Sequence, residues 1–531
     1  MQDLSWWKHA VVYQVYPRSF QDSNDDGIGD LNGIRNRLDY LVELGIDAIW
    51  ISPIYPSPMA DFGYDIADYC GIDPIFGTMD DFDRLLEAVH QRGLRLILDF
   101  VPNHTSDRHP WFVESRSSRT NPKRDWYIWR DQPNNWQSHF GGSAWEFDEK
   151  TGQYYLHEFL REQPDLDWRN PAVKAAMFDA LRFWLRKGVD GFRVDVMWLM
   201  IKDGQFRDNP PNPAYTIGQG SRAQFLPIYD ADRPEIHELV AEMRGVLEEF
   251  GDRVLIGEIY LPIPRLMDYY GPSLGGANLP FNFQLLQCAW TADELARTIG
   301  EYMSALPAGA WPNWVLGNHD KSRIATRIGL SRARAAALLL MSLPGTLTIY
   351  NGEELGMQDV AIPADDVQDP AEKRQPGIGM GRDPERTPMP WDGSPLCGFT
   401  PARPWLPIGD ANRAVNVTDS RMNPDSMLSL YQRLLRLRRD ESTLVSGKLT
   451  ELSAMDGVLR FLRSDTRARF RVCINLSDEP SEIACEDGVI AAATSARREG
   501  VRVTGSLIVA PAEAVTVKLA DSSDPVGAAS A

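Results

Sequence analysis

LNGIRNRLDYLVELGIDAIWISP (31–53) runs from an amphipathic helix, which ends near Gly45, into a short apolar strand. The same unit returns in DDFDRLLEAVHQRGLRLILDF (80–100), where the helix again ends at a glycine, Gly93. Strands that are apolar along most of their length are typical of a parallel sheet covered on both faces. Repeated units of this kind predict an α/β fold with parallel strands and crossover helices.

Further strands of the same kind are expected at VVYQVYP (11–17), GFRVDV (191–196), RVLIGEIY (253–260), WVLGNHD (314–320) and TLTIYNGEE (346–354). One more, within LPFNFQLL (279–286), completes a set of eight. Eight such strands predict a (β/α)8 TIM barrel, whose chemistry lies at the carboxyl ends of the strands. Polar residues at these ends are Asp99, Asn103, His104, Asp195, Glu258, His319 and Asp320. Packing explains carboxylates there poorly, so we expect them to form the site.

Composition divides the rest of the chain into modules. Residues 104–165 are rich in Trp, Asn, Ser and Gly and are too long for an ordinary loop, which predicts a small inserted domain. From residue 446 the short alternating strands predict an antiparallel β-sandwich. The expected organisation is barrel 1–103, inserted domain 104–165, barrel 166–445 with a Pro- and Gly-rich excursion near 355–410, C-terminal β-domain 446–520 and disordered tail 521–531.

Charge and composition limit the class of partner. The net charge of −19 argues against nucleic acid or an anionic membrane surface and favours a neutral substrate. The 16 Trp and 17 Tyr supply flat faces suited to sugar rings, although core packing accounts equally well for most of them. Five scattered cysteines without a CxxC pair predict neither a disulfide framework nor a zinc site. Without a leader or an apolar run of about 18 residues, we expect no membrane span and a cytoplasmic location.

The strand-end motifs DFVPNH (99–104), GFRVDV (191–196), GEIY (257–260) and GNHD (317–320) resemble the four motif regions of glycoside hydrolase family 13, the α-amylase family. The opening VVYQVYPRSFQDSNDDGIGDLNGI and the later RTPMPWD (386–392) resemble its oligo-1,6-glucosidase and α-glucosidase branch. The likeness extends over residues 6–520, and the motifs occur in family order. It implies a barrel with an inserted domain and a C-terminal β-domain, in agreement with the interpretation above.

The resemblance implies a retaining glycosidase in which Asp195 is the nucleophile, Glu258 the general acid/base and Asp320 the carboxylate that stabilises the transition state. Retention requires one ionised carboxylate to attack the anomeric carbon and one protonated carboxyl to donate to the leaving oxygen, roughly 5–5.5 Å apart. Burial and nearby negative charge can keep Glu258 protonated. Arg193 lies on the same strand face as Asp195, where its charge stabilises the ionised nucleophile.

The resemblance also implies a pocket that grips one terminal glucose. His104 and His319 correspond to histidines that hydrogen-bond the sugar. Asp65 in FGYDIADY corresponds to an aspartate that holds the distal hydroxyls, with Tyr64 beside it as a stacking platform. A closed pocket of this kind implies an exo-acting enzyme that releases glucose from the non-reducing end of small neutral α-glucosides.

Other residues of the resemblance bear on specificity. Arg386 in ERTPMPWD corresponds to an arginine that reaches into the pocket, and Arg382 is a weaker candidate of the same kind. Val196, directly after the nucleophile, is associated in this branch with α-1,6 activity, but Met197 and Trp198 depart from strict oligo-1,6-glucosidases. The linkage therefore stays open between maltose- and isomaltose-type substrates.

Alternatives of other classes stay open too. The same machinery supports transferases or isomerases, such as a trehalose synthase, a sucrose isomerase or an amylosucrase-like enzyme. A trehalose-6-phosphate hydrolase needs a basic aglycone pocket, for which no clear cluster is present. A non-catalytic binding subunit is disfavoured because all three carboxylates are retained. The Pro- and Gly-rich stretch 202–221 is expected to help form the subsite for the leaving group.

DSNDDGIGD (22–30) has the spacing of a calcium-type loop, with Gly27 at the sharp turn. The candidate ligands are Asp22, Asn24, Asp26, the Ile28 carbonyl and Asp30. The twelfth position is Gly33, so no bidentate glutamate closes the loop as in an EF-hand. Relatives of this branch carry Ca²⁺ or Mg²⁺ in such a loop, which implies a structural ion far from the chemistry. The alternative is an Asp/Asn-rich turn without an ion, and no cofactor is expected for catalysis.

Overall fold

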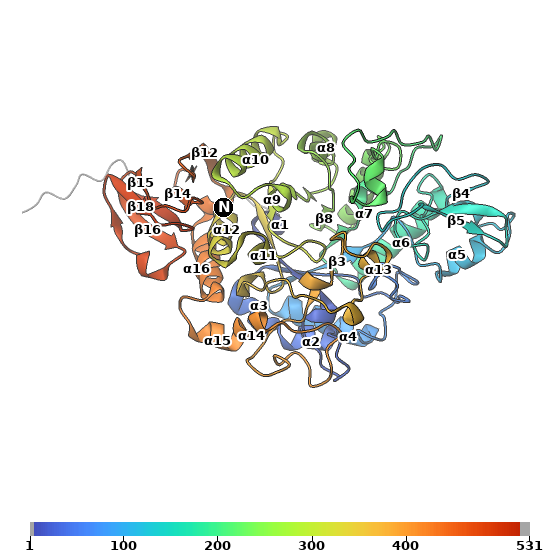
Figure 1. Cartoon of the computed structure of the whole chain (residues 1–531), viewed down its shortest axis with the longest axis horizontal. Coiled ribbons are helices and arrows are strands. Elements are labelled where there is room, and N and C mark those ends of the chain that lie inside the picture. Colours follow the sequence, from blue (N-terminus) through green and yellow to red (C-terminus); the bar gives the residue numbers. More distant parts are fainter. Residues whose placement is uncertain (1–4, 521–531) are drawn as a thin grey trace, which may run out of the picture.

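The computed structural model describes residues 5–520, and the expected disordered tail, 521–531, lies outside them. Its centre is a sheet of eight parallel strands, ordered β10-β11-β1-β2-β3-β7-β8-β9 (Figure 1). The strands are β1 (Val11–Val15), β2 (Ala48–Ile51), β3 (Arg95–Phe100), β7 (Gly191–Val194), β8 (Val254–Gly257), β9 (Leu279–Pro280), β10 (Asn313–Val315) and β11 (Thr346–Tyr350). The predicted barrel of parallel strands is confirmed.

The seam between β9 and β10 is closed by a side chain rather than by a strand ladder. The Asn313 amide donates to the Pro280 carbonyl at 2.7 Å, and its oxygen accepts from the Asn282 N–H at 2.9 Å. The strand expected over 279–286 is only two residues long, because Pro280 lacks the N–H that continued pairing needs. The chain then enters the short helix α9 (Gln284–Gln287).

Helices cover the outside of the barrel. The helix expected over 31–45 is divided at Arg37 into α2 (Leu31–Asn36) and α3 (Leu38–Leu44), and Gly45 ends α3 in a left-handed conformation with φ 99°. The longer barrel helices are α4 (Met79–Gln91), α6 (Pro171–Lys187), α7 (Ile236–Glu248), α10 (Ala292–Ala305), α12 (Leu330–Ser342) and α16 (Met427–Asp440). Shorter ones are α1 (Trp6–His9), α8 (Ile263–Asp268), α11 (Ile324–Ile328), α13 (Pro370–Arg374), α14 (Asp410–Ala414), α15 (Val417–Met422) and α17 (Ser442–Ser446).

The segment after β3 forms a small separate unit at one end of the molecule, opposite the C-terminal sheets (Figure 1). It contains the helix α5 (Pro110–Ser115) and an antiparallel sheet of β4 (Trp129–Arg130), β6 (Gln153–Leu156) and β5 (Trp145–Asp148). The ammonium of Lys202 joins this unit to the barrel, since it contacts the Asp165 carboxylate at 2.6 Å and donates to Asn103 at 2.6 Å.

The C-terminal strands are antiparallel, as predicted. Six of them form one sheet: β12 (Lys448–Met455), β13 (Val458–Ser464), β14 (Arg469–Asn475), β19 (Ala514–Leu519), β16 (Gly488–Ala493) and β17 (Arg502–Val503). β15 (Ser481–Ala484) and β18 (Ser506–Val509) pair separately. The buried Arg463 fixes this domain to the barrel because its guanidinium donates to the carbonyls of Ser342 and Leu444. Within residues 5–520, no helix combines the length and apolar character needed to cross a bilayer.

Candidate active site

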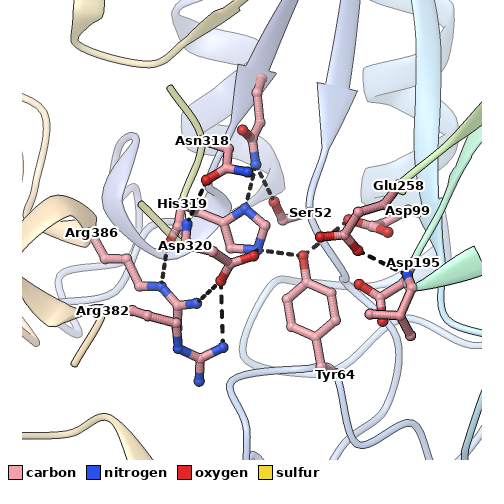
Figure 2. Close-up of polar contacts among 12 residues, drawn as sticks. Ser52, Tyr64, Asp99, Asp195, Glu258, Asn318, His319, Asp320, Arg382 and Arg386 are labelled. Atoms are coloured by element: carbon pink, nitrogen blue, oxygen red, sulfur yellow. Dashed lines mark hydrogen bonds and ion pairs between the residues drawn. The ribbon is translucent and has the colours of Figure 1, made fainter. Parts of the chain in front are cut away.

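Parallel strands bring three carboxylates to one edge of the barrel. Asp195 follows β7 and Glu258 follows β8 directly, while Asp320 lies in the loop after β10. Because the carboxyl ends of parallel strands meet at the same edge, these side chains converge. All three line one cavity of about 740 Å³. Figure 2 shows them around a common centre with their arginine, histidine and tyrosine neighbours.

A single guanidinium connects the carboxylates of three adjacent strands. Arg193 lies opposite Asp99 in the β3–β7 register, and its buried Nη1 contacts Asp99 at 2.8 Å and Asp195 at 2.7 Å. Its Nη2 contacts Glu258 Oε2 at 2.7 Å. Residues 193 and 195 share one face of the strand, as period-two alternation predicts. The arginine therefore holds Asp195 and Glu258 side by side.

Burial dominates the protonation of this pair. It raises the pKa of Asp195 well above its usual value, against Arg193, and the negative charge of Glu258 adds to the effect. Burial also raises the pKa of Glu258, with Asp320 adding in the same direction. Two carboxyl groups this close, in a buried site with one arginine, titrate as a coupled pair.

Asp320 has the opposite protonation behaviour. Burial acts to raise its pKa, but positive charge around it outweighs burial and lowers the pKa well below the usual value. Arg386 Nη2 lies 2.7 Å from Asp320 Oδ1, and Arg382 Nη1 lies 3.4 Å from the same oxygen. Asp320 is therefore ionised, whereas burial favours protonation in the neighbouring pair.

A chain of hydrogen bonds fixes His319, which is fully buried and is not among the cavity-lining residues of the described chain. The Gln14 amide donates to Nδ1 at 2.7 Å, which leaves Nε2 to donate to the Tyr64 hydroxyl at 2.6 Å. Tyr64 in turn donates to Asp99 at 3.1 Å. Tyr64 lines the cavity and is also a hydrogen-bonding link. Burial lowers the pKa of His319 well below its usual value, so the imidazole is neutral.

Comparison with known proteins assigns the family. Residues 14–447 match the model of the α-amylase catalytic domain. A probable α-glucosidase of Rhizobium meliloti is 43% identical, covering 90% of each chain, and an oligo-1,6-glucosidase of Parageobacillus thermoglucosidasius is 39% identical, covering 91% of this chain and 93% of the relative. The solved structure of the α-glucosyl transfer enzyme XgtA superimposes with a TM-score of 0.92 at 39% identity, over 98% of this chain and 100% of that one.

The isomaltulose synthase of Protaminobacter rubrum superimposes with a TM-score of 0.89 at 35% identity, over 97% of this chain and 99% of that one. The chain belongs to the α-amylase family. It is a glycoside hydrolase of that family, as its resemblance to glycoside hydrolase family 13 implied.

Asp65, predicted as a substrate ligand of this α-amylase-family enzyme, is not among the cavity-lining residues of the described chain. Asp65 is fully buried, and its carboxylate accepts from the Ser57 hydroxyl at 2.9 Å and from the N–H groups of Ala60 and Asp61 at 2.9 and 3.0 Å. It therefore holds the 57–61 loop rather than a sugar. Asp61 lines the cavity instead and contacts Arg382 at 2.7 Å. The sequence offers several aspartates around Tyr64, and spacing alone does not show which one faces the cavity.

The two candidate arginines have roles opposite to those predicted. Arg386 is fully buried and donates to the His319 carbonyl at 2.7 Å and to Asp320, so it supports the carboxylate from behind. Arg382, the weaker candidate, lines the cavity and contacts both Asp61 and Asp320. Asp369 orients it, because its carboxylate accepts from Arg382 Nε at 3.0 Å and from Nη2 at 2.8 Å.

Val196 lines the cavity and holds a strained backbone. Its φ of 36° and ψ of 45° lie in the left-handed region, which β-branched residues rarely adopt. In this conformation its N–H donates to Glu258 Oε2 at 2.8 Å. Strain of this kind costs on the order of 1–3 kcal/mol and is typical of functional sites.

The inserted unit and the Pro- and Gly-rich excursion supply walls of the cavity, and most of their lining residues were not singled out from the sequence. His104, which was expected, contacts the Tyr64 carbonyl at 3.1 Å and lines the cavity together with His139, Phe140 and Phe159. The opposite loop contributes Gly379, Met380, Gly381, Arg382, Pro384 and Glu385. The cavity-lining residues of the described chain include none from 202–221, so that stretch does not form the subsite directly.

The predicted metal loop is stabilised by its own hydrogen bonds. Asp22 accepts from the N–H groups of Asn24, at 2.9 Å, and Gly27, at 2.9 Å, while Asp26 accepts from that of Ile28 at 2.8 Å. Asp30 accepts from the Gly33 N–H at 2.8 Å and so caps α2. Across residues 5–520, no group of three or more Asp, Glu, His or Cys side chains is arranged to hold a metal. The oxygen donors suit Ca²⁺ or Mg²⁺ chemically, and an ion here stays a prediction.

Proposed function

We propose that this chain is an exo-acting, retaining α-glucosidase that releases glucose from the non-reducing end of short α-glucosides. The observation that carries the proposal is the contact of one guanidinium, Arg193, with both Asp195 and Glu258 at 2.7 Å. Two carboxyl groups held side by side suit attack and acid catalysis on the same bond. The names of the relatives from Rhizobium meliloti and Parageobacillus thermoglucosidasius support glucosides as substrates.

The proposed reaction has two displacements. In the first, the ionised Asp195 forms a bond to the anomeric carbon while the bond between that carbon and the leaving oxygen breaks. The leaving oxygen takes the proton of Glu258. In the second, the Glu258 carboxylate removes a proton from water, whose oxygen attacks the anomeric carbon and releases Asp195. Glu258 Oε2 is occupied by the Val196 N–H and Arg193, so we assign the transferred proton to Oε1.

The ionised Asp320 stabilises positive charge that develops on the sugar ring as the bond breaks. Exo action is supported by the ion pair between Asp61 and Arg382 across the cavity wall, because a pocket closed there accepts one terminal sugar only. Arg382 is further held by Asp369, which makes this closure rigid.

Transfer to an acceptor other than water is the second candidate. Similar solved structures include an α-glucosyl transfer enzyme and an isomaltulose synthase, and their likeness covers nearly the whole chain. Val196 does not distinguish hydrolysis from transfer, because its N–H donates to Glu258 whichever acceptor is used.

The test is product analysis of the purified protein with maltose, isomaltose, sucrose and trehalose offered separately, and with Asp195→Asn as the control. Free α-glucose as the first product, absent with the variant, supports the retaining hydrolase and identifies the linkage. β-Glucose as the first product contradicts the retaining mechanism. Isomerised or longer sugars with little free glucose move the assignment to a transferase.

We further propose that the 22–30 loop binds one structural divalent cation and that the enzyme is cytoplasmic. All five cysteines, Cys70, Cys288, Cys397, Cys473 and Cys485, are free, which suits a reducing compartment. Binding of an ion to the folded chain alone raises Tm. A fall in Tm after chelation, reversed by Ca²⁺ or Mg²⁺ and absent in Asp26→Ala, supports the ion site; an unchanged Tm contradicts it.

A further inference from the structure

His139 presents an imidazole to the cavity from the inserted unit. It lies in the turn between β4 and β5, where Gln137 pairs with Ser143. Its side chain remains 25% exposed. The turn meets two surface loops: the Arg374 guanidinium donates to the Gly141 carbonyl at 3.0 Å, and the Gly142 N–H donates to the Ser221 hydroxyl at 2.9 Å. These contacts place the turn against the loops that carry Arg374 and Ser221, and His139 itself lines the cavity.

The ring of His139 has hydrogen-bonding capacity that the protein does not use. Among residues 5–520, neither ring nitrogen has a hydrogen-bond partner, and Nε2 is buried whereas Nδ1 is not. Burial, together with the charges of Arg222, Lys202 and Lys321, lowers the pKa of His139 well below its usual value. The ring is therefore neutral, with one nitrogen that donates and one that accepts.

The position of the ring is fixed in advance. The His139 N–H donates to the Glu158 carbonyl at 2.7 Å, and the neighbouring Ser138 hydroxyl donates to the Phe159 carbonyl at 2.6 Å. The imidazole stacks on the Phe159 ring with a centroid separation of 4.9 Å and an interplanar angle of 18°. Because the ring is already ordered, binding a ligand group to it costs little conformational entropy of the protein.

Glu158 lies beside the buried ring nitrogen, Nε2. Its fully buried carboxyl lies with Oε2 3.8 Å from His139 Nε2, and the same oxygen is 3.2 Å from Arg222 Nη1. Arg222 also contacts Asp230 at 3.0 Å, so the loop around 222–230 supports this carboxylate. Burial raises the pKa of Glu158 to about 8, so near neutral pH this carboxyl is largely protonated, and it faces Nε2 without a hydrogen bond. Nδ1 is therefore the nitrogen left for a ligand.

We propose that the free Nδ1 of His139 forms a hydrogen bond with a hydroxyl of the leaving group, so that His139 selects substrates whose aglycone is itself a sugar or another polyol. In a pocket enzyme the glucose occupies the closed inner end, and the aglycone occupies the outer part, where we place the partly exposed ring of His139. This inference rests on the proposed α-glucosidase activity.

The experiment compares two substrates that share the glucose and differ in the aglycone. The first is maltose or isomaltose, whichever the wild type cleaves faster, and the second is p-nitrophenyl α-glucoside, whose aglycone has no hydroxyl group. His139→Phe keeps a ring to stack on Phe159 but removes Nδ1. The ratio of kcat/KM on the disaccharide to kcat/KM on the aryl glucoside should fall about tenfold, the effect of one lost hydrogen bond.

His139→Asn is the matched control, because its amide places polar atoms close to the position of Nδ1. It should retain most of the disaccharide preference that His139→Phe loses, at the same Tm. An unchanged ratio in His139→Phe, or equal losses in both variants, overturns the inference while wild-type turnover leaves the proposed function intact. Failure of the wild type to cleave either substrate contradicts the proposed function itself.

Discussion

Two pairs of buried carboxyl groups follow strands of this barrel, and only one pair faces the cavity. Asp195 and Glu258, after β7 and β8, share the guanidinium of Arg193 and line the cavity. Glu353 and Glu354, after β11, are hydrogen-bonded by tyrosine hydroxyls. These bonds run from Tyr13 and Tyr40 to Glu354 at 2.8 and 2.6 Å and from Tyr431 to Glu353 at 2.9 Å.

The difference between the pairs lies in the partner, since burial raises the pKa in both. Burial, with the charge of Glu354 adding, raises the pKa of Glu353 to about 8. A tyrosine hydroxyl carries no charge that would hold the carboxylate ionised, so Glu353 stays largely protonated near neutral pH and this pair is structural. Arg193 supplies a full positive charge, which keeps one member of its pair ionised and reactive. Position after a strand is therefore insufficient to identify a catalytic carboxyl group.

The largest expected effect comes from neutralising the nucleophile. Asp195→Asn should lower kcat/KM by on the order of 10⁴-fold on disaccharide and aryl substrates alike, because no other group can form the covalent intermediate. Tm should not fall, since the change removes one of several negative charges crowded around Arg193. Glu354→Gln, the matching change of a carboxyl to an amide, should leave kcat/KM nearly unchanged. Comparable losses of kcat/KM in the two variants would contradict the distinction between the pairs.

Glu258→Gln should separate substrates by their leaving group. Loss of the general acid should lower kcat/KM on a disaccharide by about 10³-fold. The loss on p-nitrophenyl α-glucoside should be far smaller, because that leaving group departs without a proton. Initial rates on both substrates measure the difference, and parallel losses would exclude Glu258 as the acid.

A smaller effect is expected for a second set of carboxylates, which again differ in whether their partner is a charged group in the cavity. Asp61 contacts the Arg382 guanidinium in the cavity, whereas Asp65 is bonded to backbone N–H groups. Asp61→Asn should lower kcat/KM by about 10–100-fold with little change in Tm, as a lost charged contact to substrate does. Asp65→Asn should instead destabilise the fold by roughly 1–3 kcal/mol, because an amide N–H would face the Ala60 or Asp61 N–H. Steady-state kinetics and thermal unfolding of both variants provide the measurement.

The fold and the centre of the site were predictable because both depend on strand ends. Period-two alternation places Arg193 and Asp195 on one face, and parallel register brings Glu258 beside them. The exchange of Asp65 for Asp61 was not predictable, since both lie in one irregular loop in which hydrogen bonds, not periodicity, decide which side chain turns inward. His139 was missed because its role depends on the meeting of the inserted unit with loops distant in sequence.

The smallest expected effect is on stability and concerns the tyrosine-bonded pair. The pKa of Glu353 is about 8 in the folded chain and about 4.3 for an ordinary glutamate, so the folded state binds more protons between these values. Stability is then fully present at low pH and is lost as the pH rises towards about 8. Glu353→Gln mimics the protonated form and should remove this loss.

At about pH 4 the Tm of Glu353→Gln should lie close to that of the wild type, and at about pH 9 it should be higher by a few degrees. Its kcat/KM should stay within about twofold at both pH values, because Glu353 is not among the cavity-lining residues of the described chain. Parallel Tm curves for the two proteins would mean that Glu353 is ionised in the folded state, and the tyrosine-bonded pair would then no longer differ from the pair around Arg193.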